Sequence, residues 1–254
     1  MTGLDFVLDR TVTIAARRET VFRYFTDSER FAAWWGKGSR IEPVPGGAVY
    51  IRHPNAIVAG GQVVEIVPGE RIVFSYGFES GQPIAIGASR VTIRLEETPS
   101  GTRVELRHEL PTAAARDEHV QGWRYQLALF ANVVAQEAHA GAGALADRFF
   151  ACWAESDAAR RRAELAAVAS DELAFRDPYS CTSGIDDLNA HIAASQRFMP
   201  GMVLARQGEA RSCQGTALVD WVVRGPDGTE RAKGTNVFEL TKDGRIARVT
   251  GIWG

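Results

Sequence analysis

The sequence has little of what marks metal sites, disulfide scaffolds and nucleic-acid-binding proteins. Its three cysteines, Cys152, Cys181 and Cys213, lie far apart and are odd in number. This pattern fits neither a disulfide framework nor the spacing of a Cys/His zinc site. The formal net charge is −2, and no basic run is interleaved with aromatic residues. We therefore predict no metal and no nucleic-acid partner.

Segments for export or membrane insertion are also missing. The first residues do not combine a basic segment with an apolar one, and nowhere do about 18 uncharged apolar residues follow one another. The sequence has no glycine-rich phosphate loop either. We predict no membrane partner, no cofactor and a cytoplasmic location, and the many Ala and Arg residues suggest a bacterial source.

What the sequence does contain is material for two hydrophobic cores. Its 254 residues exceed the usual length of one domain, and 45% of them are apolar. The strongest boundary signal is Gly141-Ala142-Gly143, which ends a long helical pattern. We predict an α+β protein of two domains, residues 1–140 and 141–254.

The first half alternates between apolar and polar residues in several short runs. In the last of them, Leu106, His108 and Leu110 alternate with charged residues, so one face of this strand should be buried. From about 116 to 140, apolar residues recur every three or four positions, which predicts a helix that covers the buried face. The predicted strands are 6–14, 48–53, 59–67, 71–78, 89–97 and 102–110.

The second half places its helices first and its strands last. A short strand ends at Asp177, because Pro178 cannot donate to a sheet. Two Asp-Gly pairs, at 227–228 and 243–244, are strong hairpin signals. The predicted helices are 145–153, 158–168 and one marked by Ile185, Leu188 and Ile192, and the strands are 173–177, 202–213, 216–224, 230–240 and 245–253.

Several short motifs of the first half point to a family. They are Glu19-Thr20-Val21-Phe22, the Trp34-Trp35 pair, residues 60–74, the strand pair that ends at His108, and His119-Gly122-Trp123. With these motifs, the segment from about 5 to 140 resembles the START-like, helix-grip superfamily, and within it the bacterial relatives of the heat-shock-protein-90 ATPase activator. This resemblance implies an antiparallel sheet around a long C-terminal helix, with an apolar ligand between them. The eukaryotic activator has an additional chaperone-binding domain that is not found in this sequence.

The second half, from about 142 to 254, is similar to nuclear-transport-factor-2-like proteins, SnoaL-like polyketide cyclases and ketosteroid isomerases. It shares their order of elements: helices, a short strand that ends in Asp177-Pro178, Gly184 with a helix, and four strands with a final aromatic residue. The resemblance implies a cone-shaped α+β barrel. Many members of this fold bind or assemble without catalysing a reaction, so function must come from the site itself.

Three residues of the second half are candidates for catalysis. The resemblance gives Asp177 the place of the isomerase carboxylate that moves a proton beside a carbonyl, and a carboxylate in an apolar pocket can serve as a general base. Asn236 faces inward on its strand and could donate to the developing oxyanion, and His191 lies nearby on the third helix. Each residue also has a purely structural interpretation, as an Asp-Pro turn, a buried amide and a rim histidine respectively.

One part of the isomerase pattern is missing. The first helix of the second half should present a tyrosine hydroxyl to the oxyanion, but this sequence has Phe149 and Phe150 there. We therefore do not expect the steroid isomerase reaction itself.

Ligand-binding candidates occur in both halves. His108 belongs to the inward series of its strand, where it either contacts a ligand or satisfies a neighbouring backbone group. Trp34 and Trp35 could form a lid or a hydrophobic plug, and His53 is a weaker candidate. The full set of predicted ligand-binding residues is His108, Tyr76, Trp123, Leu127 and Phe130 in the first half and Tyr179, Trp221 and Trp253 in the second.

Three functions follow from these observations. The leading prediction is that the protein binds apolar or aromatic small molecules in two internal pockets. One alternative is a polyketide-cyclase-like or isomerase-like enzyme with Asp177 as general base. The other is a chaperone-associated stress or interaction protein. A homodimer is a further prediction, because the cone fold often pairs through its exposed sheet face.

Overall fold

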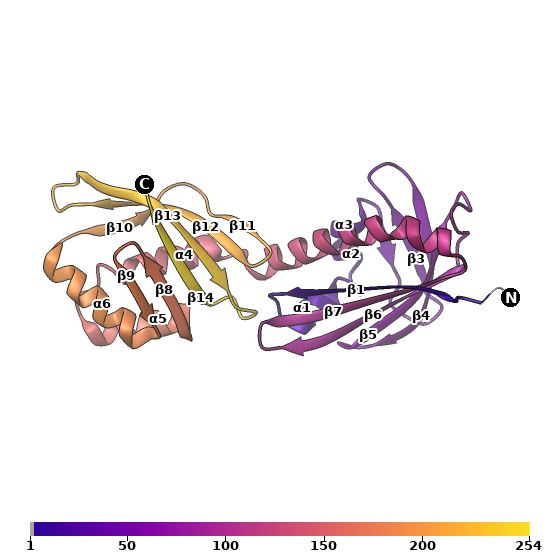
Figure 1. The fold of residues 1–254 in the computed structure, drawn as a ribbon, viewed down its shortest axis with the longest axis horizontal. Coiled ribbons are helices and arrows are strands. Elements are labelled where there is room, and N and C mark those ends of the chain that lie inside the picture. Colours follow the sequence, from indigo (N-terminus) through magenta and orange to yellow (C-terminus); the bar gives the residue numbers. More distant parts are fainter. Residues whose placement is uncertain (1–2) are drawn as a thin grey trace. The chain divides into compact units, whose positions relative to one another are not determined.

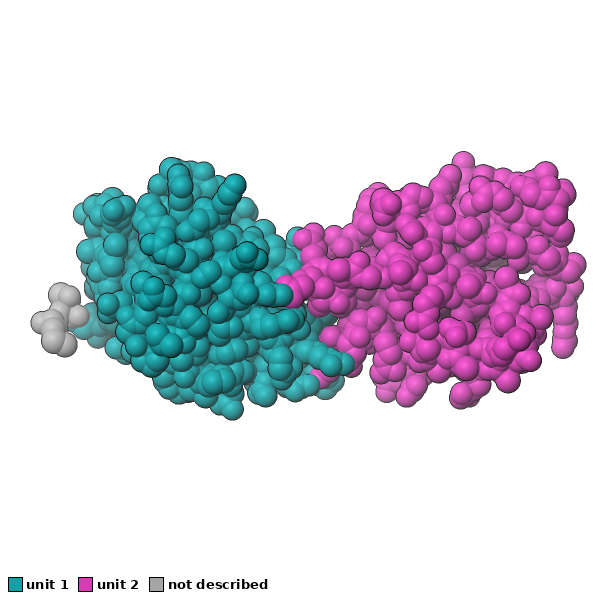
Figure 2. Space-filling model, turned by 180° about the vertical axis from the view of Figure 1, so that it is seen from behind, with its two compact units in different colours: residues 1–135 teal, residues 136–254 magenta. Residues whose placement is uncertain are grey.

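The computed structural model describes residues 3–254. Contacts between residues divide the chain into two compact units, which Figure 2 shows in different colours: one runs to Ala135 and the other from Gln136 to Gly254. The division falls in the last turns of a long helix, shortly before Gly141. The predicted boundary after residue 140 stays a prediction, and each unit is described separately below.

The first unit is an antiparallel sheet with helices against it (Figure 1). Its seven strands follow the order β1-β7-β6-β5-β4-β3-β2, and the long helix α3 runs along the sheet. The two-domain α+β fold with this helix-grip arrangement is therefore confirmed. The elements are β1 (Phe6–Ile14), α1 (Arg18–Arg23), α2 (Ser28–Trp35), β2 (Arg40–Ile41), β3 (Ala48–Arg52), β4 (Val58–Val67), β5 (Arg71–Phe78), β6 (Ser89–Thr98), β7 (Gly101–Leu110) and α3 (Ala113–Ala138).

Aromatic side chains fill the space beside the middle of α3. The ring of Phe130 lies 4.7 Å from that of Trp34 and 5.2 Å from that of Phe25. All three side chains are buried, and so is Leu127, which precedes Phe130 by about one turn of α3. This part of the space between helix and sheet is therefore solid core, and Trp34 acts as a plug rather than as a lid.

His108 is the centre of a buried hydrogen-bond chain. The indole Nε1 of Trp123 donates to His108 Nδ1 at 2.9 Å. Because an indole can only donate, the proton of the imidazole is on Nε2, which lies 2.8 Å from Ser89 Oγ. The Ser89 hydroxyl in turn donates to the carbonyl of Tyr76 at 2.8 Å. Every polar atom of the imidazole has a partner within the protein, so His108 has no atom left for a ligand.

The second unit is a curved sheet with three helices. The sheet order is β10-β12-β13-β14-β8-β9, with β11 also paired to β12. β8 runs parallel to β14, whereas the other strand pairs of this sheet are antiparallel. The elements are α4 (Ala142–Ala151), α5 (Ala158–Val168), β8 (Ala169–Asp177), β9 (Ser180–Ser183), α6 (Ile185–Phe198), β10 (Val203–Arg206), β11 (Arg211–Cys213), β12 (Thr216–Arg224), β13 (Glu230–Leu240) and β14 (Ile246–Trp253).

One predicted strand of this unit is wrong. The run at 202–213 forms two short strands, β10 and β11, instead of one. Gly208 lies between them with a φ of +75°, a left-handed conformation that interrupts a strand. The sequence also gave no sign of β9, which is only four residues long.

A buried arginine holds the helices of the second unit together. Arg161 in α5 is 1% exposed. Its Nε donates to Asn189 Oδ1 at 2.7 Å, and its Nη1 donates to the carbonyl of Glu155 at 2.6 Å and to Gln196 Oε1 at 3.3 Å. These acceptors come from α6 and from the loop between α4 and α5, so one guanidinium fixes both to α5.

We expect Arg161→Leu to lower the free energy of unfolding of the second unit by about 3 kcal/mol, because it leaves several buried acceptors without a donor. Urea unfolding of the full chain, followed by tryptophan fluorescence, would measure this loss. The matched control is Arg160→Leu. Arg160 is exposed and pairs with Glu155 on the surface, so its loss should change stability by less than about 1 kcal/mol. Equal effects of the two substitutions would contradict the role given to Arg161.

His108 should make the first unit sensitive to acid. Burial, together with the neighbouring His119, lowers the pKa of His108 from 6.5 to about 3. Below pH 6.5, His108 is therefore protonated in the unfolded chain but stays neutral in the folded unit. The stability that comes from the neutral His108 is complete above pH 6.5 and is lost as the pH falls towards 3.

Across that window the free energy of unfolding should fall by about 1.4 kcal/mol per pH unit for this one proton. His108→Gln should remove that part of the slope, whatever it does to stability at neutral pH. The measurement is urea unfolding at several pH values, with His191→Gln in the other unit as control. An unchanged slope in His108→Gln would show that the imidazole is not held neutral.

Candidate functional site

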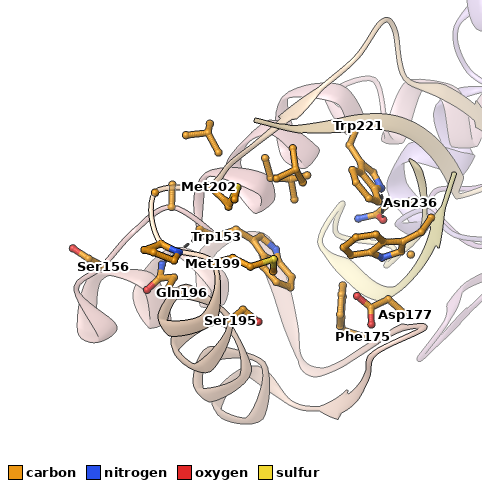
Figure 3. Close-up of a pocket in the computed structure, with 18 residues that line it drawn as sticks. Trp153, Ser156, Phe175, Asp177, Ser195, Gln196, Met199, Met202, Trp221 and Asn236 are labelled. Carbon is orange, nitrogen blue, oxygen red and sulfur yellow. Dashed lines mark hydrogen bonds between the residues drawn. The ribbon is translucent and has the colours of Figure 1, made fainter. Parts of the chain in front are cut away.

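The second unit contains a cavity of about 450 Å³ (Figure 3). Its wall is formed by the loop after α4, the ends of β8 and α6, the segment after α6, and residues of β10, β12, β13 and β14. Most of the lining side chains are apolar. They are Trp153, Ala154, Ser156, Phe175, Asp177, Ser195, Gln196, Met199, Pro200, Gly201, Met202, Val203, Leu204, Trp221, Val223, Asn236, Gly251 and Trp253.

Asn236 presents a hydrogen-bond donor to this cavity. The side chain is 5% exposed, and its Oδ1 accepts a hydrogen bond of 2.9 Å from Trp221 Nε1. Since the indole nitrogen can only donate, this bond fixes the amide with its oxygen towards Trp221. The Nδ2 group has no protein partner among the described residues and lies at the cavity wall (Figure 3).

Asp177 lies at the end of β8, where Pro178 stops the strand. Its Oδ1 accepts hydrogen bonds from the backbone N–H of Tyr179 at 2.8 Å and from Ser180 Oγ at 2.9 Å. These bonds form the expected turn after an Asp-Pro pair. Its Oδ2 has no partner among the described residues. The carboxylate is thus held by one oxygen while the other is available at the cavity wall.

Gly251 brings Asp177 and Asn236 to the same place. It pairs with Asn236 across β13 and β14, and its neighbour Thr250 pairs with Arg176 across β14 and β8. A Cβ atom on Gly251 would lie 3.1 Å from Asp177 Cβ and 3.2 Å from Asn236 Oδ1. Asp177 and Asn236 therefore both pack against Gly251, and all three residues line the same cavity.

Aromatic rings form the walls around this pair. The rings of Trp221 and Trp253 lie 5.3 Å apart in an edge-to-face contact, and on another side the ring of Trp153 lies 5.5 Å from that of Phe175. The predicted residues Trp221 and Trp253 are therefore both at the cavity. Trp153 was not among the predicted site residues, although it continues the apolar stripe of α4, which is the signal that could have found it.

Two other predicted residues lie outside the cavity wall. His191 is half-buried behind it, with its ring 5.9 Å from that of Trp153 and 6.3 Å from that of Phe175. Tyr179 is 75% exposed, and its ring meets that of Trp253 edge to face at 5.0 Å. Phe149 and Phe150 are fully buried in the core against Phe238. No hydroxyl from α4 therefore reaches the cavity.

The first unit has a cavity of about 440 Å³ at one end of the core, beside the first half of α3. Of the predicted residues, Tyr76 and Trp123 line it, as does His53. The structure does not bring His108, Leu127 and Phe130 to this cavity, since His108 is enclosed in its hydrogen-bond chain and the other two belong to the core. The lining residues are Trp35, His53, Pro54, Asn55, Tyr76, Phe78, Pro83, Glu118, His119, Gly122, Trp123, Tyr125 and Gln126.

Neither a metal-binding cluster nor a membrane-spanning helix is found in the part of the chain that the structure describes. Within residues 3–254, no group of three or more His, Cys, Asp and Glu side chains is arranged to hold a metal ion. None of the helices described there is long and apolar enough to span a membrane.

Comparison with known proteins gives a separate match for each unit. Residues 15–135 match the family model of "Activator of Hsp90 ATPase homolog 1-like protein", and residues 146–249 match the model of the "SnoaL-like domain". No curated protein is significantly similar to this chain.

Solved structures resemble one unit or the other. An AHSA1-like protein of Rhizobium etli is 34% identical, with 51% of this chain and 82% of that chain covered and a TM-score of 0.43. A candidate isomerase of the SnoaL-like family from Agrobacterium tumefaciens is 27% identical, with 46% and 98% covered and a TM-score of 0.43. The Aha1 dimer of Colwellia psychrerythraea is 16% identical, with 49% and 92% covered and a TM-score of 0.41. By its two family matches, the chain joins an Activator of Hsp90 ATPase homolog 1-like domain to a SnoaL-like domain.

Proposed function

We propose that this protein binds apolar or aromatic small molecules, and that its SnoaL-like cavity takes one that carries a carbonyl or similar oxygen. The observation that carries the proposal is the Asn236 amide, whose Nδ2 group faces a mostly apolar cavity without a partner among the described residues. The predicted homodimer, chaperone association and cytoplasmic location stay predictions.

The energetic argument rests on the unpaired donor. A buried N–H group without a partner costs about 1–3 kcal/mol, and a ligand oxygen placed against Asn236 Nδ2 would remove that cost. Aromatic and aliphatic side chains around it would gain by covering an apolar ligand body at about 25 cal/mol per Å². Among the residues that line this cavity, Asp177 is the charged one, so a neutral ligand fits better than an anion.

A second candidate function is proton transfer next to a carbonyl, and the position of Gly251 favours it. If the ligand oxygen accepts from Asn236 Nδ2, the carbon next to the carbonyl lies in the space that Asp177 also borders. Asp177 Oδ2 would take a proton from that carbon and leave an enolate, whose oxygen Asn236 stabilises. The proton would then return from Asp177 to the same carbon or to another carbon of the conjugated system. With phenylalanines on α4, this enolate has one side-chain donor fewer than in the isomerases.

We expect Asn236→Leu to weaken binding of a ketone but not of a hydrocarbon of the same shape. Suitable probes are 2-acetylnaphthalene and 2-ethylnaphthalene, measured by calorimetry on the full chain. The loss of one hydrogen bond should lower the affinity for the ketone about 3- to 10-fold. The substitution also leaves the Trp221 indole unpaired, but both probes share this effect, so the ratio of affinities isolates the Asn236 donor. An unchanged ratio would exclude the proposed contact.

We expect Asp177→Asn to abolish proton exchange while leaving binding intact, if the second candidate function holds. The probe is 2-tetralone in D₂O, with the loss of its acidic C–H signals followed by ¹H NMR. The variant should be slower by about 100-fold or more, because the amide cannot accept the proton. Asp171→Asn, which removes an exposed carboxylate of the same strand, is the matched control. If the unmodified protein fails to accelerate exchange, the proton-transfer function is ruled out and binding alone is left.

A further inference from the structure

The cavity of the first unit lies beside a glycine that the fold does not require. Gly122 is in the interior of α3, where glycine weakens a helix relative to alanine. A Cβ atom at this position would meet no atom within 4 Å, so close packing does not explain the glycine. Gly122 is exposed and also lines the cavity. Its effect is to leave free the space above the cavity, as an entrance for a ligand requires.

Among the described residues, Tyr76 and Gln126 each bring a polar atom without a partner to this cavity, and Nε1 of Trp35 and Nε2 of His53 and His119 also lack partners but are fully enclosed. Tyr76 is 3% exposed, and its hydroxyl has no hydrogen-bond partner among the described residues. Gln126 is 7% exposed and donates its Nε2 to the carbonyl of Trp34, which turns its Oε1 away from that bond. The Oε1 atom likewise has no partner among the described residues. The cavity therefore offers a hydroxyl that can donate and an amide oxygen that can accept.

The charges around the cavity select against anions. The described residues that line it include Glu118 but no Lys or Arg. An anion would therefore have no counter-charge. Burial lowers the pKa values of His53 and His119, which keeps both imidazoles neutral at neutral pH. A quaternary ammonium ion has neither a donor nor an acceptor and would leave Tyr76 and Gln126 unpaired.

The cavity walls suit a planar ring. Trp35 and Tyr76 are nearly parallel at 6.3 Å, and Trp123 meets Trp35 edge to face at 5.6 Å. Phe78 meets Tyr76 edge to face at 5.5 Å. Aromatic ligands gain both buried area and favourable ring contacts in such surroundings.

We propose that the first unit has its own binding site, which takes a neutral aromatic molecule whose polar group both donates and accepts, such as a carboxamide, and which the ligand enters past Gly122. Tyr76 donates to the ligand oxygen, and Gln126 Oε1 accepts from its N–H. This inference rests on the small-molecule binding proposed above and names the ligand class of the first unit, whereas the carbonyl site of the SnoaL-like cavity is separate and can fail or hold independently.

The test uses benzamide and ¹⁵N–¹H NMR of the full chain, because tryptophan indole signals distinguish the two sites. Trp35 and Trp123 report on the first cavity, and Trp221 and Trp253 report on the second. We expect benzamide to shift the Trp35 and Trp123 signals, and Tyr76→Phe to weaken that titration about 3- to 10-fold. Asn236→Leu should leave it unchanged. Absence of shifts at Trp35 and Trp123, or tighter binding of benzoate or benzyltrimethylammonium than of benzamide, would overturn the proposal.

Two substitutions of Gly122 test the entrance. Gly122→Phe should abolish the shifts at Trp35 and Trp123 but leave the response of the second cavity intact, whereas unchanged binding would refute an entrance at this point. Gly122→Ala should raise the melting temperature of the first unit by about 4 °C, since alanine favours the helix. A lower melting temperature would mean that the glycine is needed by the fold, and the argument for an entrance would fail.

Discussion

A buried polar side chain that is held by one hydrogen bond has its remaining polar atoms turned in a fixed direction, and both cavities depend on this constraint. In the second unit, the indole N–H of Trp221 donates a hydrogen bond to the amide oxygen of Asn236, and this bond directs the amide nitrogen to the cavity. In the first unit, the amide nitrogen of Gln126 donates a hydrogen bond to the carbonyl of Trp34, and the amide oxygen remains available. His108 is the opposite case, because both of its nitrogens are paired. Whether a buried polar side chain faces a cavity with a free atom or belongs wholly to the core thus depends on how many partners the fold gives it.

The wall of the second cavity is supported from behind by Arg161. The amide nitrogen of Gln196 donates to the carbonyls of Trp153 and Glu155, each at 3.0 Å, while its oxygen accepts from Arg161. Arg161 also donates to the Glu155 carbonyl. The loop that carries Trp153 is therefore tied to α6 and α5 by a closed set of bonds. Such support reduces the freedom that a ligand must remove on binding, which favours affinity without any direct contact.

Much of the fold could be predicted because apolar residues repeat with the period of each element. Alternation placed Asn236 on the inner face of its strand, and the Asp-Pro pair placed Asp177 at a strand end, and both residues line the cavity. The hydrogen-bond partners of buried polar side chains could not be predicted in the same way. His108 faces inward as expected, but its pairing with Trp123 and Ser89 depends on how α3 lies against the sheet. Gln126 was a usable signal that sequence reasoning missed, since it is a polar residue between Trp123 and Phe130 on the buried stripe of α3.

The structural and chemical interpretations of Asp177 are compatible, because its two oxygens have different roles. Oδ1 is engaged by the turn that Pro178 begins, through Tyr179 N–H and Ser180 Oγ. These bonds fix the orientation of the carboxylate and leave Oδ2 without a partner among the described residues, in a cavity wall that also contains Asn236. A turn residue and a general base can therefore be the same residue. What the chain does not share with the isomerases is a second donor on α4, where Phe149 and Phe150 complete the core instead. For proton transfer at this site, the C–H group of the substrate would have to be acidic enough for one amide donor to stabilise the enolate.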